Sequence, residues 1–149
     1  MPYCRNSLFL FLLFFSTSIF SQIITIDSHI DIPFDYMENP KHDPGKPTDM
    51  QVDLIKMKKG GLDSGFFVVY VPQGPLNKEG YIEAKNLAKK KFFAISKMTD
   101  IYSNQIALAL KPGDIIQAKK NNILSAAIGI ENGYVIGKDI SLLDYYFSL

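Results

Sequence analysis

A histidine and an aspartate two residues apart mark the most informative stretch of this chain, the β-prone run Thr25–Pro33. Successive side chains of a strand point to opposite faces, so His29 and Asp31 project to one side, with Asp27 on that side as well. An imidazole and a carboxylate about 7 Å apart at their Cα atoms can both bind one cation such as zinc. The plain alternative is a strand whose end carries a surface histidine and aspartate. The tripeptide alone favours that alternative.

The elements that must position this pair alternate along the chain. Apolar runs predict strands at residues 25–32, 65–71 and 123–130, and helical spacing predicts helices at residues 50–59, 78–110, from 112 to about 120, and 142–147. Thr48 or Asp49 is expected to cap the first helix and Gly60-Gly61 to end it. Strand–helix alternation is typical of a parallel α/β protein.

About three βα units are too few to close an eight-stranded barrel, which usually needs about 250 residues. The chain has 149 residues and halts inside an apolar helix at Leu149. We therefore expect the front part of a longer protein. In parallel α/β folds the carboxyl ends of strands converge, which brings Glu131, at the end of the third predicted strand, toward His29 and Asp31. The plain alternative for Glu131 is an ordinary acidic residue at the edge of a loop.

Two polar features are expected to be unremarkable. His42 lies in a proline-spaced stretch, residues 35–48, and is interpreted as a loop residue. The lysine run at residues 89–91 is interpreted as a solvated helix face.

The N-terminus predicts a secretory signal peptide over residues 1–21, followed by one domain over residues 22–149. Arg5 precedes an unbroken apolar run, Leu8–Phe15, and small serines follow it. The apolar run is short for a membrane span of about 20 residues, so no stable span is expected after cleavage. The expected location is secreted or periplasmic, and the alternative is a retained anchor.

Composition excludes several classes of partner and scaffold. Beyond residue 21 the chain has 15 lysines, no arginine and 15 acidic residues, which argues against a nucleic-acid partner. It has no cysteine there, so export implies no disulfide framework. Stability must come from a packed core, helped by a metal if one is bound. A homodimer is compatible with the sequence.

Three blocks in order carry a resemblance to a known family. The stretch Asp27–Pro33 (DSHIDIP) resembles the first metal motif of the membrane (renal) dipeptidases, a family of metal-dependent hydrolases. The segment Gln51–Pro72, with its Gly60-Gly61 pair, is similar to the next block, and Ile128–Gly133 (IGIENG) to the third. The similarity runs from about Ile24 to the end of the chain.

The resemblance implies a fold, a reaction and a set of site residues. The fold would be the N-terminal portion of a TIM (β/α)8 barrel. His29 and Asp31 would bind one zinc ion, and Glu131 would bridge to a second, giving two ions per complete active site. Two bridged ions can ionise a shared water and polarise the scissile carbonyl, and the family's substrates are dipeptides. Tyr70 would lie near the substrate, although a core tyrosine with a satisfied hydroxyl is the plain alternative.

The sequence departs from the family pattern in two ways. The third block reads Glu131-Asn132-Gly133, whereas the family has Glu-Gly-Gly. After Glu131 the chain has no histidine and no arginine, so the family's second-zinc histidines and substrate-binding arginine are not matched. We therefore expect this chain alone to be inactive. The leading hypothesis is the N-terminal part of a secreted zinc dipeptidase, and the alternatives are a non-catalytic remnant or binding module of the same fold and a membrane-anchored structural protein.

Overall fold

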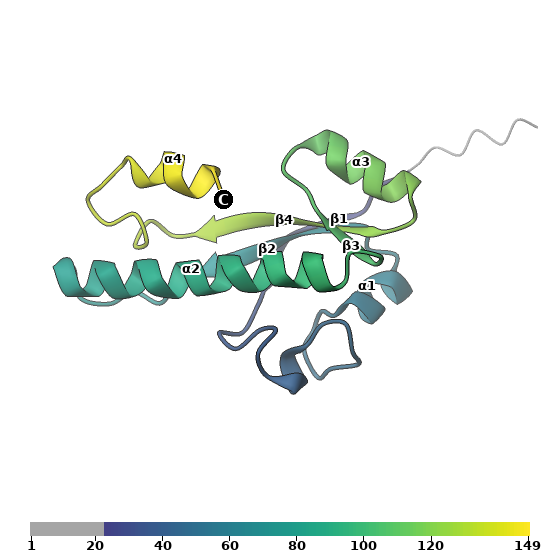
Figure 1. Ribbon diagram of the computed structural model, residues 1–149, viewed down its shortest axis with the longest axis horizontal. Coiled ribbons are helices and arrows are strands. Elements are labelled where there is room, and N and C mark those ends of the chain that lie inside the picture. The colour runs from purple at the N-terminus through teal and green to yellow at the C-terminus, as the bar shows by residue number, and fades with distance from the viewer. Residues whose placement is uncertain (1–22) are drawn as a thin grey trace, which may run out of the picture.

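A four-stranded parallel sheet with helices packed around it makes up the computed structural model, which describes residues 23–149 (Figure 1). The predicted α/β fold class is therefore confirmed. In chain order the elements are β1 (Ile26–Asp31), the 3-10 helix η1 (Pro40–His42), α1 (Leu54–Gly60), β2 (Ser64–Tyr70), α2 (Lys78–Ile101), β3 (Ile106–Leu108), α3 (Pro112–Lys120), β4 (Leu124–Glu131) and α4 (Leu142–Phe147).

The strands lie in the order β1-β2-β4-β3, and every neighbouring pair is parallel. Strands β2 and β4 pair without interruption from Ser64 opposite Ser125 to Tyr70 opposite Glu131. Their arrows point toward the same edge of the sheet in Figure 1. Residues at the carboxyl ends of β1, β2 and β4 therefore share one edge, although the first and last of these strands are about 100 residues apart in sequence.

Strand β1 is irregular in its middle. Asp27 stands opposite Gly65 and Ile30 opposite Phe67, so the register shifts by one residue between them. The irregularity is a β-bulge, which re-aims side chains. The Asp27 carboxylate accepts a hydrogen bond from the His29 backbone N–H at 2.9 Å. Asp27 thus holds the bulge instead of joining the side chains of His29 and Asp31 as the plain alternation predicted.

Helix α2 covers the sheet with an apolar stripe. Four of its residues recur at helical spacing, are buried, and share one core cluster with Phe67 and Val69 of β2, namely Ala84, Ala88, Ile95 and Met98. Truncating a fully buried residue such as Met98 to alanine costs about 2–5 kcal/mol. This packing fixes the sheet edge from which the candidate site is built.

The first predicted helix was too long at its amino end. Helix α1 begins at Leu54, and its N-cap is Asp53, not Thr48 or Asp49. The Asp53 carboxylate is 1% exposed and accepts hydrogen bonds from the Lys56 N–H at 2.8 Å and the Thr48 hydroxyl at 3.0 Å. Gly61, with φ of 71°, ends the helix as predicted.

The predicted helical tract at residues 78–110 was also too long. Helix α2 ends at Ile101, a turn follows, and Ile106–Leu108 then pairs with Leu124–Ala126 as β3. A run of three strand residues is too short for the period of hydrophobicity to identify it. The other predicted strands and helices are confirmed, with bounds shifted by a residue or two.

Beyond Ala126 the outer edge of β4 has no strand beside it within residues 23–149. A hollow of about 650 Å³ lies along this edge, and side chains of Leu110 and Phe147 border it, 76% and 95% exposed. Within the same residues no helix is both long and apolar enough to cross a bilayer. The predicted signal peptide lies outside the described residues.

Candidate metal centre

The end of β1 presents two of the candidate ligands. The side chains of His29 and Asp31 are 50% and 73% exposed, and His29 Nε2 lies 3.8 Å from Asp31 Oδ1. Ile30, between them, is buried in the core, which fixes the direction of its neighbours. The β-bulge held by Asp27 sets the turn of the strand at this point.

Glu131 reaches the same place from the end of β4. Its carboxylate lies 3.3 Å from His29 Nε2 through Oε2 and is 42% exposed. The next residue, Asn132, has a φ of 64°, a conformation that asparagine tolerates better than most residues. Its side chain donates to the Val71 carbonyl at 3.0 Å and accepts from the Tyr134 N–H at 2.9 Å. Asn132 therefore keeps the turn that a glycine allows and adds two hydrogen bonds to it.

The three side chains form one cluster. His29, Asp31 and Glu131 each offer a ligand atom, and these atoms all lie within 4.8 Å of one another. Zinc lies about 2.0–2.2 Å from nitrogen and oxygen ligands in tetrahedral sites, which places neighbouring ligand atoms about 3.3–3.5 Å apart. The His29–Glu131 distance of 3.3 Å fits this spacing, and Asp31 needs a small side-chain rotation. An imidazole nitrogen with carboxylate oxygens is also a donor set that suits zinc.

The cluster has few hydrogen bonds of its own. Within residues 23–149, His29 is the only basic side chain with a nitrogen within 4.0 Å of the Asp31 or Glu131 carboxylate. Two carboxylates near each other and without donors are unfavourable unless a cation joins them. The arrangement therefore suits a cation better than it suits a structural hydrogen-bond network.

Lys91, which sequence reasoning assigned to a solvated helix face, is buried beside this edge. It is 3% exposed, whereas Lys89 and Lys90 are exposed as predicted. Burial lowers the pKa of the Lys91 ammonium, and the charges of Asp31 and Glu131 oppose that shift. The helical period contained a signal for it, because Lys91 falls on the buried stripe three residues after Ala88 and four before Ile95.

Tyr70 ends β2 directly opposite Glu131 and is half-buried. Its ring centroid lies 6.0 Å from the Lys91 ammonium. The structure therefore places Tyr70 at the same sheet edge as the candidate ligands. Contact with a substrate stays a prediction.

His42 lies in a separate group of polar residues. It ends η1, and its Nδ1 lies 2.5 Å from Asp35 Oδ1. Asn39 also donates to Asp35, at 2.9 Å. These hydrogen bonds, that from Asn39 first, hold the pKa of Asp35 below its usual value. His42 thus closes a short 3-10 helix where the sequence predicted only a loop, and it is bound to its own neighbours and not to the cluster.

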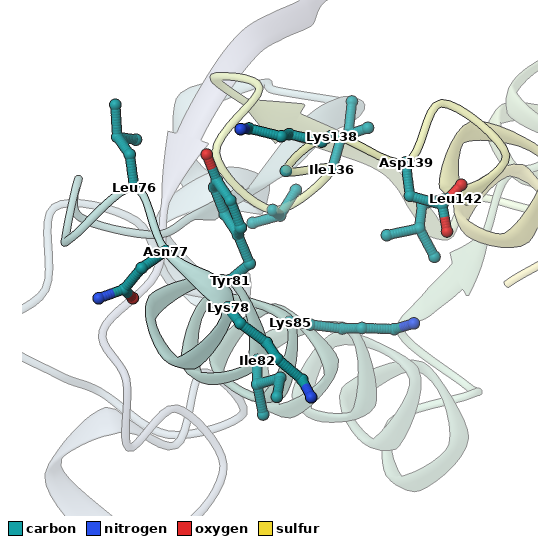
Figure 2. Close-up of a pocket in the computed structure, with 12 residues that line it drawn as sticks. Leu76, Asn77, Lys78, Tyr81, Ile82, Lys85, Ile136, Lys138, Asp139 and Leu142 are labelled. Carbon is teal, nitrogen blue, oxygen red and sulfur yellow. The ribbon is translucent and has the colours of Figure 1, made fainter.

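A cavity of about 570 Å³ lies apart from the cluster, between the first turns of α2 and the loop after β4. Figure 2 shows Tyr81 and Lys85 on the helix side and Ile136, Lys138 and Asp139 on the loop side. None of the predicted site residues lines it. The candidate chemistry is thus at the open sheet edge and outside this cavity.

Comparisons with known proteins agree with this arrangement. The model of a family described as membrane dipeptidase (peptidase family M19) matches residues 15–149. The probable dipeptidase PvdM from Pseudomonas aeruginosa is 23% identical, with 84% of this chain and 32% of that one covered and a TM-score of 0.76. A metallopeptidase from Rhodobacter sphaeroides, solved with a phosphinate mimic of the dipeptide L-Ala-D-Ala, is 20% identical, with 85% and 43% covered and a TM-score of 0.69.

A third solved structure, the metallopeptidase dipeptidase AC, is 23% identical, with 85% of this chain and 40% of that one covered and a TM-score of 0.68. The chain thus spans between 32% and 43% of the length of these three proteins. At these identities the likeness shows the fold. The predicted correspondence to part of a TIM barrel is confirmed, because dipeptidases of this family are TIM-barrel hydrolases.

Proposed function

We propose that this chain, which belongs to the membrane dipeptidase family, contributes three metal-binding side chains to a secreted zinc dipeptidase. One observation carries the proposal: His29, Asp31 and Glu131, from opposite ends of the sequence, offer ligand atoms within 4.8 Å of one another. Within the described residues, His29 supplies the only basic nitrogen within 4.0 Å of the two carboxylates, so no network of local ion pairs accounts for their meeting. A bound metal ion would account for all three, because each side chain could be one of its ligands.

Each side chain has a separate part in the proposed site. His29 and Asp31 would hold one zinc ion from the end of β1, and Glu131, with two carboxylate oxygens, would hold the same ion and reach a second. Bound zinc supplies Lewis-acid polarisation of a carbonyl and activation of water. Asn132 keeps Glu131 at the strand end by fixing the turn that follows. Tyr70, opposite Glu131, would form one wall of the place where a dipeptide binds.

The proposed substrates are dipeptides. Support comes from the family membership and from the structural relative solved with a dipeptide mimic. The chain spans about a third of such proteins, so the second-zinc ligands and the substrate-binding arginine would lie outside the 149 residues. We expect the 149-residue chain alone to bind zinc weakly and to hydrolyse no dipeptide.

The test is dipeptide hydrolysis by the intact protein that carries this chain, purified with zinc. We expect turnover that His29→Ala reduces by at least about a hundredfold, since a metal ligand should matter at least as much as the groups that support ligands. The matched control is His42→Ala, which removes the other histidine and should leave turnover unchanged. Zinc binding without hydrolysis would favour the non-catalytic remnant, and failure to bind zinc would reject the zinc dipeptidase.

Export is part of the proposal and needs its own measurement. A signal peptide over residues 1–21 predicts that the exported protein has lost Arg5 and the whole apolar run. The intact mass of protein recovered from the periplasm or medium tests this. A mass that includes Arg5 would favour a retained anchor.

A further inference from the structure

Lys91 is the one buried ammonium of α2, and the proposed function gives it no role. It is 3% exposed, although lysine is almost never fully buried unless it is paired. Within residues 23–149 it has no carboxylate within 4.0 Å, so no close ion pair explains the burial. Keeping an unpaired charge there costs free energy.

Three contacts place the Lys91 ammonium at the carboxyl edge of the sheet. It donates to the Ile32 carbonyl at 2.7 Å, and Ile32 directly follows Asp31. It lies 4.6 Å from the centroid of the Phe34 ring and 6.0 Å from that of Tyr70, the residue opposite Glu131. The ammonium therefore lies at the carboxyl ends of β1 and β2, beside the residues that carry the candidate ligands, and it is buried.

The charges around Lys91 are those of the cluster. Asp31 and Glu131 are the carboxylates whose fields act on it most, and they favour its charged form against the effect of burial. A positive charge so placed attracts the two carboxylates when no metal is present. The same charge repels any divalent cation that the carboxylates and His29 bind.

We propose that Lys91 is a positioning residue that sets the metal affinity of this site, acting as a resident cation near Asp31 and Glu131. The inference rests on the proposed function, because it requires His29, Asp31 and Glu131 to hold the metal. Lys91 touches neither metal nor substrate. It holds the backbone after Asp31 through Ile32 and weakens divalent binding through its charge.

The test is the zinc affinity of the intact protein that carries this chain, measured by competition with a chromophoric chelator in the absence of any substrate. Lys91→Met removes the charge at similar length, and we expect it to tighten zinc binding by roughly tenfold, the order expected for a unit charge several Å from a divalent ion. Lys91→Arg keeps the charge and should restore the original affinity. Lys89→Met, which removes an exposed charge two residues away, is the matched control and should change nothing.

The possible outcomes distinguish failure of this inference from failure of the proposed function on which it rests. Zinc binding that His29→Ala abolishes but Lys91→Met weakens or leaves unchanged would overturn the inference alone, since a merely structural lysine predicts that result. Absence of zinc binding in both the unaltered intact protein and its Lys91→Met variant would overturn the inference together with the proposed function.

Two further measurements apply if Lys91→Met does not fold. Lys91→Gln removes the charge and keeps an N–H donor for Ile32, and the same gain in affinity is expected. In the unaltered chain, the ¹³Cε resonance of Lys91 should move when zinc binds while that of Lys89 stays in place. A Lys91 resonance that ignores bound zinc would overturn the inference.

Discussion

Both histidines within residues 23–149 face carboxylates, but the two pairs are built in opposite ways. His42 meets Asp35 seven residues away, at 2.5 Å, in a loop where Asn39 already donates to that carboxylate. His29 lies 3.3 Å from Glu131, which comes from another strand, and the two side chains form no hydrogen bond with each other. The first pair is complete as it stands, whereas the second has ligand atoms left over. A histidine beside a carboxylate indicates a metal site only when local donors do not satisfy the carboxylate.

The largest expected effect is the response to zinc. A ligand that binds only the folded state stabilises it by about 2.7 kcal/mol at a hundred times its dissociation constant. We expect added zinc to raise the melting temperature of the intact protein that carries this chain, and Asp31→Ala or Glu131→Ala to remove most of that rise. His42→Ala should melt with the same zinc response as the unaltered protein. A response lost in His42→Ala and kept in Asp31→Ala would reverse the assignment of the two histidines.

The sequence was sufficient to identify the cluster because its members lie at strand ends. Parallel pairing brings such ends to one edge wherever the helices pack, so the positions of His29, Asp31 and Glu131 in the sequence predict that they lie together. Separately, long apolar runs predict three of the four strands. Strand β3 was missed because its three residues carry no measurable period.

What the sequence could not supply were the contacts that depend on tertiary packing. The sequence pattern predicts a helix that starts at Met50, which puts Asp53 inside it, and only burial and the hydrogen bond from Thr48 identify Asp53 as the cap. Lys91 stands in a run of three lysines, which by itself predicts a solvated helix face. The β-bulge at Asp27 depends on the pairing of β1 with β2, which no single strand reveals.

The second-largest expected effect concerns Asp53, whose carboxylate already accepts hydrogen bonds from Thr48 and Lys56. Asp53→Ala removes the N-cap of α1 and leaves the Lys56 N–H without its acceptor, so we expect a loss of about 1–2 kcal/mol in the free energy of unfolding. Asp53→Asn should recover only part of this loss, because its amide oxygen can accept from the Lys56 N–H but its amide nitrogen cannot accept from the Thr48 N–H. Urea denaturation measures both. The control is Asp49→Ala, at an exposed residue. An equal loss of unfolding free energy in that variant would mean that Asp53 is not the cap of α1.

A smaller effect concerns the loop pair and depends on pH. Asn39 and His42 lower the pKa of Asp35 below its ordinary value of 3.8 in the folded chain. A lowered folded pKa gives stability that is present above the unfolded pKa and lost as the pH falls through the folded value. Asp35→Asn should therefore be less stable than the unaltered chain near neutral pH, and the difference should close below about pH 3.8.

The His42→Ala background checks the partners of Asp35. Because Asn39 still donates there, the effect of Asp35→Asn should shrink without vanishing. Denaturation across a pH series in both backgrounds measures it. A difference that stayed constant from neutral to acid pH would show that the charge of Asp35 does not matter.

The smallest expected effect is on the free energy of unfolding when the charge of Glu131 is removed in the absence of metal. Glu131→Gln keeps the size of the side chain, and the carboxylate it replaces is 42% exposed and accepts no hydrogen bond from residues 23–149. Two charge effects oppose each other at this position, since Glu131 is attracted by Lys91 and repelled by Asp31. We therefore expect the free energy of unfolding without metal to change by no more than about 0.5 kcal/mol, the usual range for a surface substitution.

Urea denaturation in the presence of a chelator measures this change, with Asp53→Ala measured in parallel, and zinc is then added to the same samples. A loss above about 1 kcal/mol without metal would mean that Glu131 is held for stability, as Asp53 is, and would remove the main reason for assigning it to a metal.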